Sequence, residues 1–225
     1  MGIGSALRQA LRDFYFNSWR LAPANLVWGI VLVAALFLGP VSIVGGALLV
    51  FLAIPTVGLY RMAALVARDE PATFGDFIGA MRRFGLGALG VAIAVAALGL
   101  VLTSNIFVGL ESDNPLGWLI TAMALWGDVA LVLFLVVFWP VFVDPRREGV
   151  GLRQKLALAG LAVIGRPIRV IALAVAVGLV LTASTILFAM LVIVSVAYVA
   201  LVSSRVVLPM VDELEARLPA PREAR

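Results

Sequence analysis

Asp128 is the single charged residue in the stretch 114–143, and its carboxyl group is the strongest candidate for chemistry in the chain. It lies roughly 18 to 22 Å from either end of the helix that this stretch predicts. An acid at the centre of a bilayer costs about 2.5 to 3.5 kcal/mol and by default marks a proton relay or a cation site.

Two other interpretations of Asp128 stay open. A protonated acid can hold neighbouring helices together through a hydrogen bond, and an acid can also lie in a water-filled vestibule without a role. Because a carboxyl group in hydrocarbon lacks partners, we expect Asp128 to face the interior of a helical bundle rather than lipid.

The chain contains no cysteine and no histidine. This composition excludes disulfides, thiolate chemistry, imidazole bases and the usual zinc ligands. Residues Gly85–Gly90 match the dinucleotide-binding fingerprint, but that fingerprint requires a preceding strand in a soluble βαβ unit, and here a membrane span follows. Because the spans contain neither a nucleophile with its base nor a metal cluster, we expect no enzyme and no bound cofactor.

The elements that must position Asp128 follow from the charge pattern. All 17 Lys and Arg residues lie in four clusters, at 8–20, 61–83, 146–169 and 205–225. The composition is 63% hydrophobic, and a membrane-spanning helix needs about 20 mostly apolar residues. The pattern therefore predicts a single all-α membrane domain over 1–225, with a tail at 209–225 and six transmembrane helices at about 21–38, 41–67, 85–108, 116–143, 167–185 and 187–208.

The basic clusters also predict the orientation, because cytoplasmic loops carry an excess of Lys and Arg. Six spans place both termini and both internal basic loops on the cytoplasmic side. The opposite side shows the loop 103–117, which carries Glu111 and Asp113 and no basic residue. We expect the basic residues to contact an anionic inner leaflet, where each gains about 1 kcal/mol, and we expect no nucleic acid partner.

Three segments beside the spans have the pattern of amphipathic helices at the membrane surface. The first is residues 1–20, which Phe16 and Trp19 anchor at the interface. In the second, Thr73 and Asp76 form a capping box that opens a helix. The apolar face of that helix consists of Phe74, Phe77, Ile78, Met81 and Phe84.

The third surface helix follows residue 151 and has a weaker pattern. Its predicted apolar face consists of Leu152, Leu156, Ala159 and Val163. Its predicted water-facing side consists of Arg153, Gln154 and Lys155. A docking surface for a cytoplasmic or membrane protein is the alternative interpretation of these helices.

A proline and two stripes of small residues predict features of the interior of the bundle. Pro55 lies within the second span and has no N–H group, so we expect a kink at Ala53–Thr56. A broken span can expose carbonyl groups to a ligand, although neighbouring helices more often satisfy them. Small residues at every fourth position allow close helix packing, with a homodimer face as the alternative. These stripes are Ala88, Ala92 and Ala96, and Ala174, Gly178 and Thr182.

Three segments resemble the YesL-like family of bacterial integral membrane proteins. That family shows an Asn-Leu-Leu-Trp-like first span, a Pro-containing turn that runs into an Ala-Leu-Tyr-like stretch, and a Phe-rich helix. The resemblance covers about residues 25–84. The matching positions are Asn25, Trp28, Pro55, Thr56, Gly58, Leu59, Tyr60 and Phe77. The resemblance implies a multi-pass protein of the bacterial cytoplasmic membrane, and family members often lie in sugar-uptake loci.

Two functional hypotheses follow. The first is a non-enzymatic membrane protein that acts as an accessory or partner-binding component of solute uptake, with carbohydrate as the solute that the resemblance implies. The alternative is a small transporter or channel that uses Asp128 and the span broken at Pro55. A polar cavity that reaches Asp128 would favour transport, and a dry, closed bundle would favour the accessory role.

The predicted orientation can be tested with single cysteines, since the native chain has none. Ser112→Cys lies in the predicted outer loop and should react with a membrane-impermeant maleimide in intact cells. Glu148→Cys lies in a predicted cytoplasmic loop and should react only after permeabilisation. Labelling of Glu148→Cys in intact cells would reverse the orientation.

Overall fold

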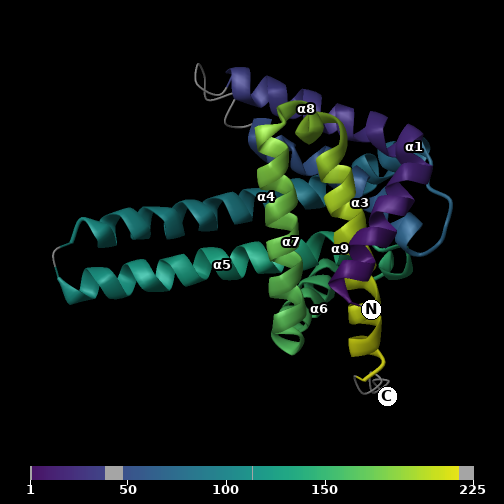
Figure 1. Cartoon of the computed structure of the whole chain (residues 1–225). Coiled ribbons are helices and arrows are strands. Elements are labelled where there is room, and N and C mark those ends of the chain that lie inside the picture. Colours follow the sequence, from purple (N-terminus) through teal and green to yellow (C-terminus); the bar gives the residue numbers. More distant parts are fainter. Residues whose placement is uncertain (1, 39–47, 113, 218–225) are drawn as a thin grey trace.

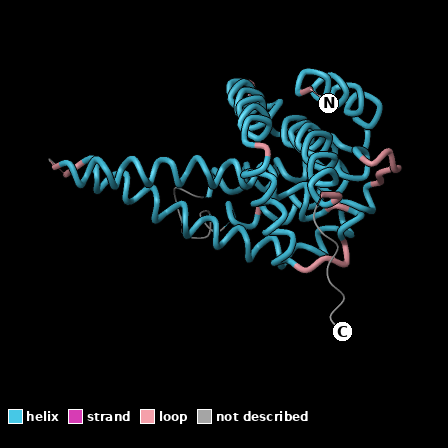
Figure 2. The backbone as a smooth tube through the Cα atoms, turned by 90° about the horizontal axis from the view of Figure 1, so that it is seen from below, coloured by secondary structure: helices cyan, strands magenta, loops and turns pink. Residues whose placement is uncertain are grey.

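The computed structural model describes residues 2–38, 48–112 and 114–217, which are mainly helical and contain no strand. A body of crossing helices carries one projecting helical hairpin (Figures 1 and 2). The elements are α1 (Ile3–Leu38), α3 (Ala53–Ala67), α4 (Phe74–Leu110), α5 (Pro115–Val143), the 3₁₀ turn η1 (Pro145–Arg147), α6 (Leu152–Gly165), α7 (Pro167–Ile186), α8 (Phe188–Met190), the π-helix η2 (Leu191–Ser195) and α9 (Val196–Glu215).

Within the described residues, six helices are long and apolar enough to cross a membrane, which confirms the predicted number of spans and the all-α fold class. They are Ile3–Leu38, Leu48–Ala67, Phe74–Leu110, Pro115–Val143, Pro167–Ile186 and Phe188–Glu215. The predicted start of the second span at 41 and the tail beyond 217 lie outside the described residues.

The structure corrects the boundaries of the first and last spans. The amphipathic segment 1–20 and the first span form one continuous helix, α1. Leu21 and Ala24 are buried on either side of Pro23, so packing holds the helix through the proline. The last helix continues past the predicted end at 208 to Glu215.

The predicted capping box at the start of α4 is confirmed. The Thr73 hydroxyl accepts from the Asp76 N–H at 3.3 Å, and the Asp76 carboxylate accepts from the Thr73 N–H at 2.8 Å. The helix does not end at the membrane surface as predicted but runs on to Leu110. Phe84 packs against Phe142 of α5 with ring centroids 5.7 Å apart, so the first turns of α4 lie on the body of the protein.

The core lies between α3 and α9, the two most buried spans. Small residues on both helices are fully buried and allow their backbones to approach closely. They include Ala63, Ala64, Ala197 and Ala200. The helices α4 and α5 are mostly exposed, and they form the hairpin that projects from the body (Figure 1).

Gly58 sets the distance between α3 and α4. A Cβ atom at this position would lie 2.6 Å from Cε2 of Phe77, whose ring is fully buried against the glycine. Only a residue without a side chain leaves room for the ring. The contact therefore depends on glycine for space, because the backbone of Gly58 is ordinary helix.

Gly58→Ala should lower the free energy of unfolding by about 1 to 3 kcal/mol, since the added methyl group overpacks the contact with Phe77. The measurement is the thermal unfolding midpoint of the purified protein in detergent. Gly90→Ala is the matched control, because no atom lies within 4 Å of the added methyl group there. That change should be neutral or stabilising. Equal effects of the two substitutions would contradict the packing argument.

Candidate functional site

Asp128 lies in the seam between the two helices of the hairpin. Thr121 and Ala124 face α4, and the same face of α5 continues at helical spacing to Asp128. Gly127 packs against Leu102 of α4, which sets the level of Asp128 along the hairpin. The Asp128 side chain is half-buried.

The carboxyl group of Asp128 makes no hydrogen bond or ion pair with residues 2–38, 48–112 or 114–217. The α4 residues at its level include Gly99 and Leu102, which have no side-chain donor, and the space beside Gly99 is open. The next turn of α4 exposes Thr103, Ser104 and Asn105. Asp128 thus lies on the face of α5 that packs against α4, in the hairpin that projects from the body (Figure 1).

The second span is interrupted at Leu52, next to the predicted kink at Ala53–Thr56. Pro55 has no N–H group to donate to the preceding turn. Thr56 compensates, because its N–H and its hydroxyl both donate to the Leu52 carbonyl, at 3.1 and 2.7 Å. The broken backbone is therefore largely satisfied from within the chain.

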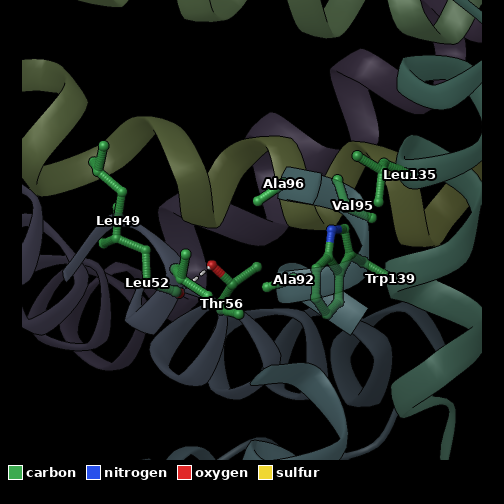
Figure 3. A pocket seen from close by; sticks show the side chains of 10 residues that line it. Leu49, Leu52, Thr56, Ala92, Val95, Ala96, Leu135 and Trp139 are labelled. Atoms are coloured by element: carbon green, nitrogen blue, oxygen red, sulfur yellow. Dashed lines mark hydrogen bonds between the residues drawn. The ribbon is translucent and has the colours of Figure 1, made fainter. Parts of the chain in front are cut away.

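A cavity of about 280 Å³ opens beside this break (Figure 3). Its side chains are apolar apart from the Thr56 hydroxyl and the ring nitrogen of Trp139. The α5 residue of its wall nearest in sequence to Asp128 is Leu135, roughly 10 Å further along the helix. The structure therefore does not bring Asp128 and the break at Pro55 together.

The side chain of Asn25, the first family-like residue, satisfies backbone hydrogen-bonding groups in and next to η2. Its Nδ2 donates to the carbonyls of Leu191 at 3.2 Å and Val192 at 2.7 Å, and its Oδ1 accepts from the Ala197 N–H at 2.7 Å. A π-helix departs from the regular helical hydrogen-bond pattern, and a bilayer holds no water to satisfy the freed groups. Fully buried Asn25 satisfies them instead.

The other family-like residues lie in the same interior. Trp28 Nε1 donates to Thr56 Oγ1 at 3.0 Å, which joins α1 to α3. Tyr60 packs against Trp139 of α5 with ring centroids 6.5 Å apart. The remaining four are buried in the core: Pro55, Gly58, Leu59 and Phe77. The structure thus gives the family-like residues packing and hydrogen-bonding roles.

Five charged residues meet where α3, α5 and α9 end, and we call them the charged cluster. Asp144 is fully buried, accepts from Arg68 at 2.7 Å and pairs with Arg147. Asp212 accepts from Arg68 at 3.0 Å and from Arg147 at 2.6 Å. Glu215 accepts from Arg147 at 3.1 Å. Two buried guanidinium groups thus lie among three carboxylates.

Both arginines of the charged cluster are held in the charged form. Burial opposes the charge on Arg147, but hydrogen bonds with Glu215 and Asp212 and the charge of Asp144 outweigh it and raise its pKa. Burial likewise opposes the charge on Arg68, whose pKa is raised by Asp212 and Asp144. Arg68 and Arg147 therefore stay positively charged at every ordinary pH.

Arg153 and Gln154 on α6 are exposed as predicted, but the prediction that this side faces water is wrong for Lys155. It is only 3% exposed, and its Nζ donates to the Phe142 carbonyl at 2.8 Å. The rings of Phe84 and Phe142 each lie 5.5 Å from Nζ, so they replace part of its hydration. Burial lowers the pKa of Lys155, against the raising effect of Asp144 and Glu148.

Three more arginines join helices on the side of the charged cluster. Glu148 bridges Arg61 of α3 and Arg83 of α4. Arg205 of α9 donates to the carbonyl of Val66 at 3.0 Å, which satisfies part of the C-terminal end of α3. These contacts and the charged cluster form one ionic end of the body.

The charged cluster was missed because each member reads as an ordinary residue flanking a span. Asp144 follows the last residue of α5, and Arg68 follows the last residue of α3. Opposite charges directly after several spans on one predicted side are a signal for ion pairing. They do not say which residues pair, because the sequence does not show which helix ends are neighbours.

A scan against protein-family models, a search of curated proteins and a search of solved structures each find no match. The resemblance to the YesL-like family stays a prediction.

Asp144→Asn should lower the free energy of unfolding by about 3 to 5 kcal/mol, because it leaves Arg68 and Arg147 buried with less opposing charge. Thermal unfolding in detergent measures the change. Glu213→Gln is the control, since Glu213 is half exposed and pairs with Arg166 at the surface. Its effect should stay below about 1 kcal/mol. If both variants lose the same stability, the cluster contributes no more than a surface pair.

Proposed function

We propose that this protein is a non-enzymatic accessory component of a membrane solute-uptake system, and that the α4–α5 hairpin binds a membrane-embedded partner. The observation that carries the proposal is the carboxyl group of Asp128, which has no hydrogen bond or ion pair among the described residues and lies in the seam of a hairpin that projects from the body (Figure 1). The resemblance to the YesL-like family supports solute uptake, with carbohydrate as the solute class.

The energetics of Asp128 favour a partner. A carboxyl group in hydrocarbon without a hydrogen bond costs several kcal/mol. Neither Gly99 nor Leu102 offers a side-chain donor at its level. A polar side chain on a second protein would supply the missing bond, and such intramembrane hydrogen bonds contribute about 0.6 to 2 kcal/mol.

The surface of the hairpin also suits a helical partner. Its large apolar side chains include Leu100 and Trp126, which are 69% and 71% exposed. Small residues let another helix approach closely. An exposed set on α4 consists of Gly90, Ala94 and Ala97. The small residues and the exposed apolar side chains thus support contact with another protein along α4, the helix that faces Asp128.

A transport path through this chain alone is the second candidate, built from Asp128 and the break at Pro55. The cavity beside the break has an almost wholly apolar wall, and Asp128 is separated from that wall along α5. This separation supports the accessory role over the transporter or channel.

Photo-crosslinking amino acids at Leu100 and Trp126 should give an adduct with a membrane component of a solute-uptake system in native membranes. Leu179 on α7 is the matched control, because it is exposed to a similar degree and lies outside the hairpin. Mass spectrometry identifies the adduct. Adducts with lipid alone, or equal protein adducts from Leu179, would contradict the proposal.

Exchange of Asp128 tests the same contact by a second route. Asp128→Asn keeps a hydrogen-bonding side chain and should retain most of the crosslink. Asp128→Leu should reduce the crosslink yield at Trp126 about threefold or more, since one intramembrane hydrogen bond is lost. The amount of folded protein should stay the same in both. An unchanged yield with Asp128→Leu removes Asp128 from the interface.

A further inference from the structure

A polar pocket of about 640 Å³ lies where the first turns of α1 meet α9 and the turn after α3. Arg205 of α9 joins the three segments, because it donates to Asp13 of α1 at 2.8 Å and to Asp69 of the turn at 3.0 Å. The other lining residues all belong to α1 and are Ser5, Arg8, Gln9 and Arg12. Every lining residue is polar or charged, so the pocket suits a polar ligand.

The unpaired charges of this pocket are positive. Arg205 pairs with both carboxylates, those of Asp13 and Asp69. Neither Arg8 nor Arg12 forms an ion pair in the part of the chain that the structure describes. Three arginines thus stand against two aspartates, and the pocket has one net positive charge. The ligand that this charge favours is an anion.

Arg8 and Arg12 are both exposed and lie one helical turn apart on α1. Like charges at this spacing are neighbours on the helix surface and repel each other. Arg8 donates through Nε to the Gly4 carbonyl at 3.5 Å, and the Arg12 guanidinium lies 5.8 Å from the Phe16 ring centroid. The terminal nitrogens of both guanidinium groups have no hydrogen bond among the described residues. A phosphate group matches the planar fork of each arginine and would remove their repulsion.

The side of α1 that carries the two arginines continues toward the hydrocarbon core of the membrane. Tyr15 and Trp19 each follow one of the arginines by seven residues, which is close to two turns and keeps them on the same side. They are 76% and 69% exposed. Leu26 follows Trp19 by another seven residues, is also exposed, and lies in the part of α1 that has no charge. Charge, aromatic rings and aliphatic side chains thus follow one another in the order of headgroup, interface and hydrocarbon.

We infer that this polar pocket binds the phosphate group of one anionic phospholipid. Arg8 and Arg12 bind the phosphate oxygens, and the acyl chains follow the exposed side of α1 along Tyr15, Trp19 and Leu26. The net positive charge selects an anionic over a zwitterionic headgroup. The exposed rings beyond the pocket select a lipid over a free phosphate. The site is separate from the hairpin and does not depend on the proposed function.

The test is the thermal unfolding of the purified full chain in detergent, titrated with phosphatidylglycerol, phosphatidylcholine or glycerol 3-phosphate. Phosphatidylglycerol should raise the unfolding midpoint at the lowest concentration, since it binds the folded state. The double variant Arg8→Gln with Arg12→Gln should weaken its apparent affinity about 30-fold, because each charge contributes about a factor of five. Without lipid, this variant should unfold at the same temperature as the native chain or slightly above it, because the repulsion between the arginines is gone.

Two matched controls separate the site from general effects. Arg82→Gln with Arg153→Gln removes the same charge from exposed positions elsewhere and should leave the affinity unchanged. Trp19→Gln should weaken phosphatidylglycerol binding about fivefold, because part of a large apolar contact with the lipid is lost. Trp118→Gln, at a similarly exposed position on α5, should have no effect on that affinity.

Three results would overturn the inference. Equal affinity for phosphatidylcholine would remove the selection by charge. Equal affinity for glycerol 3-phosphate, or no effect of Trp19→Gln, would show that the ligand is a free phosphate and not a lipid. Equal weakening by the control pair of arginines would reduce the effect to the net charge of the protein.

Discussion

Backbone groups inside a bilayer have no water to bind, and this constraint governs the interior of the protein. Asn25 of α1 supplies the donor and acceptor groups that η2 needs. Thr56 restores bonds at the break before Pro55, and Arg205 binds the last carbonyls of α3. In two of these places the group comes from a segment far away in the sequence, so local structure and tertiary structure depend on each other.

The ion pairs are concentrated at one end of the protein. Arg68 and Arg147 each bind more than one carboxylate, so α3, α5 and α9 share ions at their ends. Removal of one partner leaves buried charge, which costs far more than the loss of a surface pair. The outer half of the hairpin has packing between α4 and α5 but no comparable ionic contacts among the described residues. Ion pairs therefore tie the helices together at one end of the protein, and among the described residues packing holds the outer half of the hairpin.

Hydropathy and charge were enough to predict six spans and the all-α class, because each span must be apolar over about 20 residues whatever its neighbours. The capping box at Thr73 was also predictable, since its bonds are local. Lys155 was placed on the wrong side because the acceptor and rings that receive it come from other helices. For the same reason local sequence pattern did not predict the continuity of α1, the continuity of α4 or the charged cluster. The location of Asp128 inside a span was predictable, because it depends only on the apolar residues around it.

The unbroken length of α4 has a mechanical consequence. At 37 residues the helix is about 55 Å long, well beyond the roughly 30 Å of a bilayer core, and it has no joint between its capping box and Leu110. Near its start Phe77 rests on Gly58, and about two turns later Arg83 shares Glu148 with Arg61. A tilt imposed on the outer end of the helix must therefore act on these contacts at its base. Force applied to the tip of the hairpin is thereby delivered to the ion pairs at its base.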